Sequence, residues 1–193
     1  MERNLNKQNI DAAIAEYERS IESIGGNISG LRGVELFQCI KRQPLNSGPY
    51  PHVTLFEAAN RIMTDLVILK GVKWMLASNL FPFSEYIVEY GNEDNNDHDI
   101  LALNNGKRLN GEAFNVAPSF FQSKKSTAIK KLRASKNKAD YIVILINADA
   151  VGENYSPKLK EKEFFVFVDI ISGKARVLSS KPIHPIPKSG EAD

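Results

Sequence analysis

The chain has little cysteine and no long apolar segment. Cys39 is the single cysteine among 193 residues, which excludes an internal disulfide and a zinc site made of cysteines alone. No apolar run is long enough to cross a bilayer, and the opening residues, MERNLNKQNI, lack the apolar core of a signal peptide. These absences predict a cytoplasmic protein with no membrane partner.

Several common catalytic motifs are also missing. The sequence contains no phosphate-loop glycine motif, no Gly-x-Ser-x-Gly and no Cys-x-x-Cys. His52, His98 and His184 lie far apart and lack the spacing of metal ligands. We expect His98 to be an exposed turn residue, and contact with a substrate stays open because it adjoins Asp99.

The composition is that of an ordinary folded domain. Hydrophobic residues make up 42% and charged residues 25%, with a net charge of +2. We expect residues 1–50 to form a helical and irregular segment that packs on a core at residues 51–180. The Pro-rich tail at residues 181–193 is expected to be extended or loose.

Apolar periodicity predicts helices in the first half of the chain. One apolar stripe indicates a helix over residues 9–24. Thr54 and Glu57 form a capping box, which opens an apolar helix through about Leu69. Gly71 is a candidate end or interruption of this helix, and the alternative is that the stretch VKWMLASNL continues it. The stretch VELFQCI between them fits either a short helix or a strand.

Strands dominate the second half. Runs at residues 85–91, 99–103 and 109–117 predict an antiparallel meander, and Asn105-Gly106 is a hairpin signal between the last two. A helix at residues 119–135 has the length of a crossover, which makes the apolar strand at 139–147 a parallel neighbour of 109–117. Further strands follow at 163–171 and 175–179. The predicted fold is α/β: a mixed β-sheet, with an antiparallel meander plus a parallel crossover strand, flanked by helices.

Two acids of the meander need an explanation. Asp99 precedes the apolar strand ILAL, and Glu112 shares a strand face with Phe114 and Val116. A carboxylate among apolar side chains is costly unless a partner compensates it. Either each acid pairs with a basic residue or a hydrogen-bond donor, or both converge on a divalent cation such as Mg²⁺.

The helix at 119–135 opens a stretch of one charge sign. Between Ser119 and Lys138 there are seven Lys or Arg and no acid. A solvated helix face is the usual cause, and a phosphate-binding surface is the alternative. Lys125 falls within the apolar stripe of this helix and Lys124 at its margin. A lysine on that face either snorkels to solvent or reaches across the sheet toward Glu112.

The element order and the two acids resemble the PD-(D/E)XK, or restriction-endonuclease-like, nuclease superfamily over roughly residues 56–171. The resemblance places the two acids of that family at Asp99 and Glu112. The family's lysine, two residues after the second acid, falls on Phe114, where this sequence departs from the pattern. Some members add a glutamate from the first core helix; Glu57 has that position, although its place in the capping box explains it as well.

The resemblance implies a restriction-endonuclease-like fold and a metal-dependent nuclease that hydrolyses phosphodiester bonds of DNA. A restriction-type endonuclease is one form of this function, and a homodimer is one form of assembly. The implied cofactor is Mg²⁺ or Mn²⁺, and the candidate metal ligands are Asp99, Glu112 and Glu57.

The remaining candidates follow from the missing lysine and the basic helix. The candidate catalytic residues are Asp99, Glu112, Lys125, Lys124 and Gln122, with Lys125 favoured over Lys124 as the substitute lysine. The candidate DNA-binding residues are Lys124, Lys130, Lys131 and Arg133. Phe114 supports an alternative: a catalytically degenerate nuclease-fold module that binds DNA or another protein.

Overall fold

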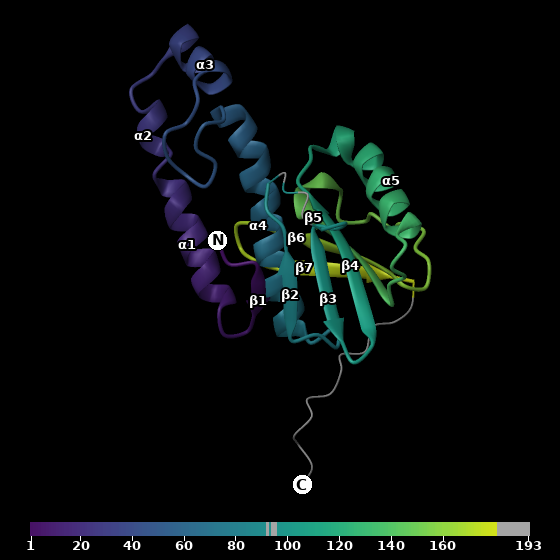
Figure 1. Ribbon diagram of the computed structural model, residues 1–193. Coiled ribbons are helices and arrows are strands. Elements are labelled where there is room, and N and C mark those ends of the chain that lie inside the picture. Colours follow the sequence, from purple (N-terminus) through teal and green to yellow (C-terminus); the bar gives the residue numbers. More distant parts are fainter. Residues whose placement is uncertain (92, 94–95, 181–193) are drawn as a thin grey trace.

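One mixed sheet of seven strands organises the protein (Figure 1). The computed structural model describes residues 1–91, 93 and 96–180, so the expected loose tail at 181–193 lies outside the described residues. The strands lie side by side in sequence order: β1 (Asn4–Asn6), β2 (Glu85–Val88), β3 (Ile100–Asn104), β4 (Lys107–Phe114), β5 (Tyr141–Asn147), β6 (Glu163–Val168) and β7 (Ala175–Ser179). Strands β4, β5 and β6 pair in parallel, and the other neighbours pair antiparallel. The predicted mixed α/β sheet is therefore confirmed.

The hairpin and the crossover follow from local sequence. Asn105 and Gly106 have φ of 48° and 75°, as a tight two-residue hairpin turn between β3 and β4 requires. Helix α5 (Pro118–Ala134) has a proline at its first position, where the missing N–H costs nothing. It then returns the chain to β5, which pairs parallel to β4 with Glu112 opposite Ile144.

Two helices cover the two faces of the sheet. Helix α4 (Leu55–Ser78) packs on one face and α5 on the other. Strand β5 is buried on both, as predicted: Val143 belongs to the α4 core and Ile144 to the α5 core, and both are 0% exposed. Helix α4 continues past Gly71 to Ser78. A Cβ at position 71 would stand 2.5 Å from a methyl of Leu145, so the close contact with β5 requires glycine there. Gly71 is a close-packing position of α4 and not its end.

The N-terminal segment packs beside α4. It contains α1 (Ile10–Glu22), α2 (Gly25–Ile28) and α3 (Gly33–Arg42), which follow α4 on the side away from α5 (Figure 1). The stretch VELFQCI is helical and belongs to α3. The short strand β1 was not expected, because its three residues, Asn-Leu-Asn, carry little strand signal. A short 3-10 turn, η1 (Ala148–Ala150), follows β5. In the part of the chain that the structure describes, none of the helices could cross a membrane.

Candidate functional site

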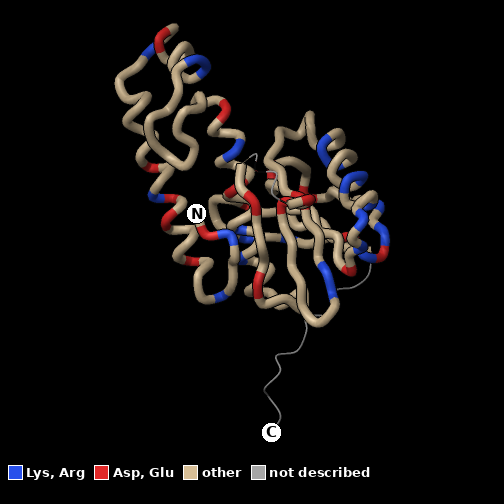
Figure 2. Tube along the Cα trace, viewed as in Figure 1, with Lys and Arg blue, Asp and Glu red and all other residues tan. Residues whose placement is uncertain are grey.

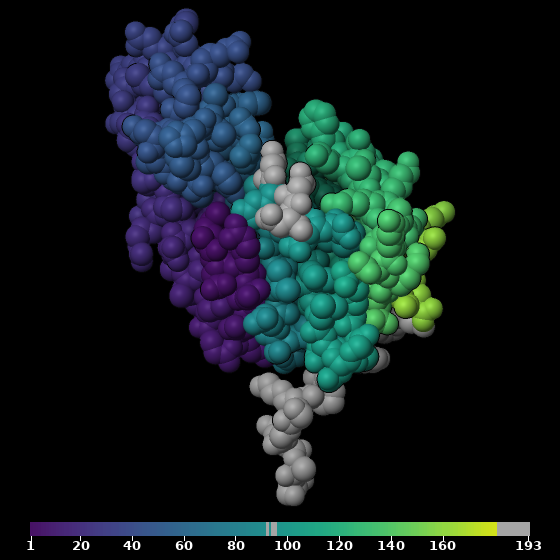
Figure 3. Space-filling view, viewed as in Figure 1, coloured from purple at the N-terminus to yellow at the C-terminus, as the bar shows by residue number. Residues whose placement is uncertain are grey.

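A cavity of about 680 Å³ opens where β4 ends and the chain enters α5. It lies between the first half of α4 and the first turns of α5, where the surface in Figure 3 is hollowed. Two carboxylates line it, those of Glu89 and Asp99. Its other polar side chains come from the two helices and from the end of β4: Asn60, Arg61, Thr64, Asn115, Ser123 and Lys124.

Asp99 is an acid of this cavity whose pKa is raised. Its carboxylate accepts a hydrogen bond from the backbone N–H of Ala113 at 2.8 Å, and its carbonyl accepts one from the backbone N–H of Glu89 at 3.0 Å. Burial, followed by the negative charge of Glu112, raises the pKa of Asp99 to about 6, against the opposing effects of the Ala113 N–H and Lys131. The charge of Glu89 adds to the rise. Asp99 is thus a carboxylate in a crowded negative field, which a cation would relieve.

Glu112 is held by basic partners on the α5 face of the sheet. It is 8% exposed, and its Oε1 lies 3.0 Å from Nδ1 of His98. The ammonium of Lys131 lies 2.8 Å from Oε1 and 3.0 Å from Oε2. A buried acid at this position needs either basic partners or a metal ion. The structure shows basic partners, His98 and Lys131, at Glu112. Asp99 and Glu112 still lie near each other, because each charge acts on the other, but Glu112 is not among the described residues that line the cavity.

His98 is buried rather than exposed, so the expectation of an exposed turn residue is wrong. It is 4% exposed, and both of its ring nitrogens have partners. Nδ1 contacts the Glu112 carboxylate, and Nε2 lies 3.1 Å from the Ser135 hydroxyl. The order Ser–His–carboxylate is that of serine hydrolases. Here Lys131 neutralises the carboxylate, and the hydroxyl also contacts the Asn137 carbonyl at 3.3 Å. We therefore interpret the Ser135–His98–Glu112 contacts as structural: they hold the residue after α5 against the sheet.

Lys125 does not reach Glu112, so its expected placement is wrong. Its ammonium donates hydrogen bonds to the Tyr155 hydroxyl at 3.2 Å and to the side chain of Gln122. Lys131 follows Lys125 by six positions, so the two side chains point in directions about 240° apart around the helix. As a result Lys131 faces β4, while Lys125 and Gln122 face a second cavity over β6. Lys124, the less favoured candidate, lines the cavity of Asp99.

Glu57 is explained by its helix terminus. Its backbone N–H donates to the Thr54 hydroxyl at 3.3 Å, as expected for the cap, and its exposed carboxylate pairs with Arg61. Glu57 is not among the described residues that line the cavity of Asp99, whereas Arg61 is. The structure therefore does not bring Glu57 together with Asp99 as a third ligand.

Basic residues recur along α5 (Figure 2). Some of their side chains form ion pairs within the protein. Lys130 is exposed. Lys131 contacts Glu112, and Arg133 makes a two-point ion pair with Glu163 at 2.7 and 3.0 Å. Of the candidate DNA-binding residues, Lys124 and Lys130 are the two that stand outside these pairs in the structure.

Glu89 is the cavity residue that the sequence pattern also signals but that we did not select. It is an acid inside the apolar run IVEYG, which is the same signal that identified Glu112. Glu89 is 5% exposed and accepts a hydrogen bond from the side-chain amide of Asn96 at 2.7 Å. Over residues 1–91, 93 and 96–180, no three His, Cys, Asp or Glu side chains form a group that could hold a metal. Glu89 and Asp99 are the two acids that line the cavity, and Mg²⁺ commonly takes only one or two protein carboxylates and completes its shell with water and phosphate.

The Mg²⁺ or Mn²⁺ cofactor, the DNA partner, the homodimer and the cytoplasmic location all stay predictions. No protein-family model, no curated protein and no solved structure matches this chain.

Proposed function

We propose that this protein is a metal-dependent nuclease of the restriction-endonuclease-like kind that hydrolyses phosphodiester bonds of DNA. The observation that carries the proposal is the position of Asp99 in a cavity of about 680 Å³, together with a second carboxylate and two basic side chains. The order α4, β2, β3, β4, α5, β5 is the order that the resemblance requires, and it supports the proposal.

Asp99 and Glu89 are the residues that would hold Mg²⁺ or Mn²⁺. A bound ion would supply a polarised phosphate oxygen and a water of lowered pKa. The Ala113 N–H fixes the Asp99 carboxylate, so this ligand is already oriented. Glu112 acts on the site through its charge, which disfavours the ionised form of Asp99 and so strengthens its demand for a cation.

Arg61 and Lys124 are the residues that would bind the phosphate. They come from opposite walls of the cavity, α4 and α5. The Nε–H of Arg61 is buried and has no acceptor among the described residues. A buried donor without a partner is costly. The guanidinium also pairs with Glu57 through Nη2, so a phosphate would contact its remaining N–H groups.

A non-catalytic DNA-binding module is the second candidate, and two observations favour it. Phe114, where the resemblance requires a lysine, is 7% exposed and packs in the α5 core. Glu112 has basic partners in place of a free carboxylate. Under this alternative the protein keeps the basic surface of α5 and binds DNA without cutting it.

A plasmid-nicking assay with the full chain and Mg²⁺ or Mn²⁺ distinguishes the two candidates. We expect metal-dependent cleavage, and we expect Asp99→Asn to slow it by about 100-fold or more, because the loss of one ligand removes several kcal/mol of transition-state stabilisation. The matched control is Asp97→Asn, an exposed acid two residues away, which should cleave at the wild-type rate.

DNA binding is measured in parallel as a function of salt. We expect Lys124→Ala and Lys130→Ala each to reduce the slope of log K against log salt by about one, since each removes one phosphate contact. Binding with that slope but without cleavage at any metal concentration would establish the non-catalytic module. Cleavage by Asp99→Asn at the wild-type rate would refute the site assignment.

A further inference from the structure

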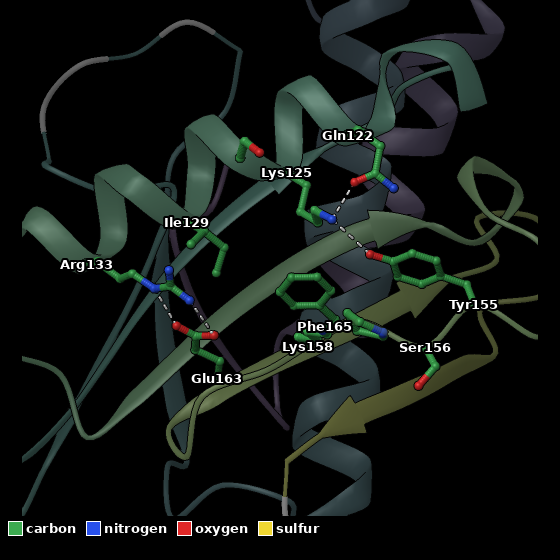
Figure 4. A pocket seen from close by; sticks show the side chains of 11 residues that line it. Gln122, Lys125, Ile129, Arg133, Tyr155, Ser156, Lys158, Glu163 and Phe165 are labelled. Carbon is green, nitrogen blue, oxygen red and sulfur yellow. Dashed lines mark hydrogen bonds and ion pairs between the residues drawn. The ribbon is translucent and has the colours of Figure 1, made fainter.

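A second cavity, of about 430 Å³, lies on the other side of α5, between that helix and the chain segment after β5 (Figure 4). Its size falls within the range of about 300–1,000 Å³ that is usual for small-molecule sites. Ile129 of α5, Phe165 of β6 and Pro157 give it apolar walls. The cavity is distinct from that of Asp99, because the adjacent residues Lys124 and Lys125 enter one cavity each.

Lys125 projects into this cavity with neutral partners. Its ammonium donates to the Tyr155 hydroxyl at 3.2 Å and to the amide oxygen of Gln122. It also lies 5.4 Å from the ring centre of Phe121 and 5.7 Å from that of Tyr155, which are cation–π distances. Among the described residues these contacts are with neutral groups, so they fix the position of the ammonium without cancelling its charge, which is the arrangement expected of an anion-binding group.

The remaining charges leave the cavity with a positive balance. Glu163 and Arg133 line one end and pair with each other through two hydrogen bonds (Figure 4). Burial alone would raise the pKa of Glu163, but the hydrogen bonds from Arg133 and from the Lys160 N–H outweigh it and lower the pKa. Glu163 is therefore ionised and cancels Arg133, so Lys125 and Lys158 contribute two positive charges.

We infer that this cavity binds a nucleoside monophosphate. A phosphate monoester carries about −1.5 to −2 at neutral pH, which matches the two lysines. Pro157 and the partly exposed Tyr155 provide the apolar surface on which a flat base would pack, above a floor of Ile129 and Phe165, which are 9% and 2% exposed. Ser126 of α5 and Ser156 of the segment after β5 also line the cavity, from different walls, and offer hydroxyl groups to polar atoms of the ligand. The inference goes beyond the proposed nuclease and does not depend on it.

Calorimetric titration of the full chain with AMP, adenosine and inorganic phosphate tests the inference. We expect AMP to bind at least ten times more tightly than adenosine or phosphate, because only AMP engages both the lysines and the apolar wall. Lys125→Ala should weaken AMP binding by about tenfold or more. Tyr155→Phe, which removes one acceptor that positions the ammonium, should weaken it by a smaller factor.

The control is Lys130→Ala, an exposed lysine of the same helix, which should bind AMP like the wild type. Asp99→Asn should also leave AMP binding unchanged, so a failure of the nuclease proposal is separable from a failure here. Equal affinity for phosphate and AMP, equal affinity for adenosine and AMP, no binding of AMP, or an equal loss in Lys125→Ala and Lys130→Ala would each overturn the inference. Thermal unfolding of each variant shows whether it is folded.

Discussion

Asp65 and Asp99 are both largely buried acids with a raised pKa, and they differ in what surrounds them. Asp65 of α4 is 0% exposed and accepts hydrogen bonds from the hydroxyl groups of Tyr17 and Tyr50 and from the Gly91 N–H. Asp99 accepts one from the Ala113 N–H, and it lines a cavity of about 680 Å³. Burial is the largest cause of the raised pKa in both cases.

The difference separates a structural acid from a candidate functional one. The carboxylate of Asp65 links α4 to α1 through Tyr17 and to the loop that contains Tyr50. Its hydrogen bonds therefore hold the N-terminal segment on the core. Asp99 faces space and the charges of Glu112 and Glu89, neither of which stabilises its ionised form. A raised pKa therefore does not identify a site by itself; a raised pKa beside unfilled space is the informative combination.

The largest effect that would test this comparison is on stability. Asp65→Ala leaves two tyrosine hydroxyls and the Gly91 N–H without their acceptor, so we expect a loss of about 2–5 kcal/mol in the free energy of unfolding. Urea denaturation measures it. Tyr50→Phe removes one of the three bonds and should cost about 1 kcal/mol.

The control for Asp65 is Asp11→Ala. Asp11 pairs with Lys73 at 2.6 Å, but both side chains are more than half exposed, so the change should stay within about 1 kcal/mol. Equal losses in Asp65→Ala and Asp11→Ala would show that the tyrosine cluster does not anchor the segment.

Asp99→Ala is the second test, and it should differ from Asp65→Ala in sign or size. The variant loses one hydrogen bond beside a cavity that water can enter, and it removes a repelled charge, so we expect its stability at pH 7 to stay within about 1 kcal/mol of the wild type or to rise. A loss as large as that of Asp65→Ala would mean that Asp99 has a structural role.

The pH dependence sharpens that test. The pKa of Asp99 is about 6 in the folded state and about 3.9 in the unfolded state, so the folded state binds more protons between these values. The contribution of Asp99 to stability must then fall as pH rises from about 4 to about 6, and the loss is complete above that window. Asp99→Ala should lack this part of the wild-type pH dependence, which denaturation at pH 4, 5, 6 and 7 would reveal.

Sequence pattern located strands β2 to β7 because each of them carries its own signal, whereas the three residues of β1 carry little. The Asn105-Gly106 turn, the crossover helix and the doubly buried β5 follow from local residue types, and the structure confirms them. The site was harder to predict because it depends on the rotation and tilt of α5 over the sheet. Lys125 and Lys131 differ in which strand they face, and the apolar stripe fixes the buried side of the helix without giving its direction across the strands.

Contacts of Asp65 were beyond sequence pattern for a related reason. Its partners Tyr17 and Tyr50 come from the N-terminal segment, and no periodicity pairs a tyrosine of one helix with an aspartate of another. Glu89, by contrast, was within reach, since it interrupts an apolar strand just as Glu112 does.

Lys131 offers the smallest and most specific test, because it touches Glu112 and acts on Asp99 only through its charge. The Lys131 side chain is 48% exposed and that of Glu112 is 11% exposed, so water screens the ion pair in part. Because His98 still contacts Glu112, Lys131→Ala should cost about 1 kcal/mol of stability. The positive charge of Lys131 lowers the pKa of Asp99, so its removal should raise that pKa further above about 6. Carbon-detected NMR of the Asp99 carboxyl during a pH titration measures the change.

The control is Lys130→Ala, an exposed lysine one residue away from Lys131, which should leave the pKa of Asp99 unchanged. A pKa that is the same in Lys131→Ala and Lys130→Ala would show that the Glu112 pair is electrically separate from the cavity, and Glu112 would then lose even its indirect part in the proposed site.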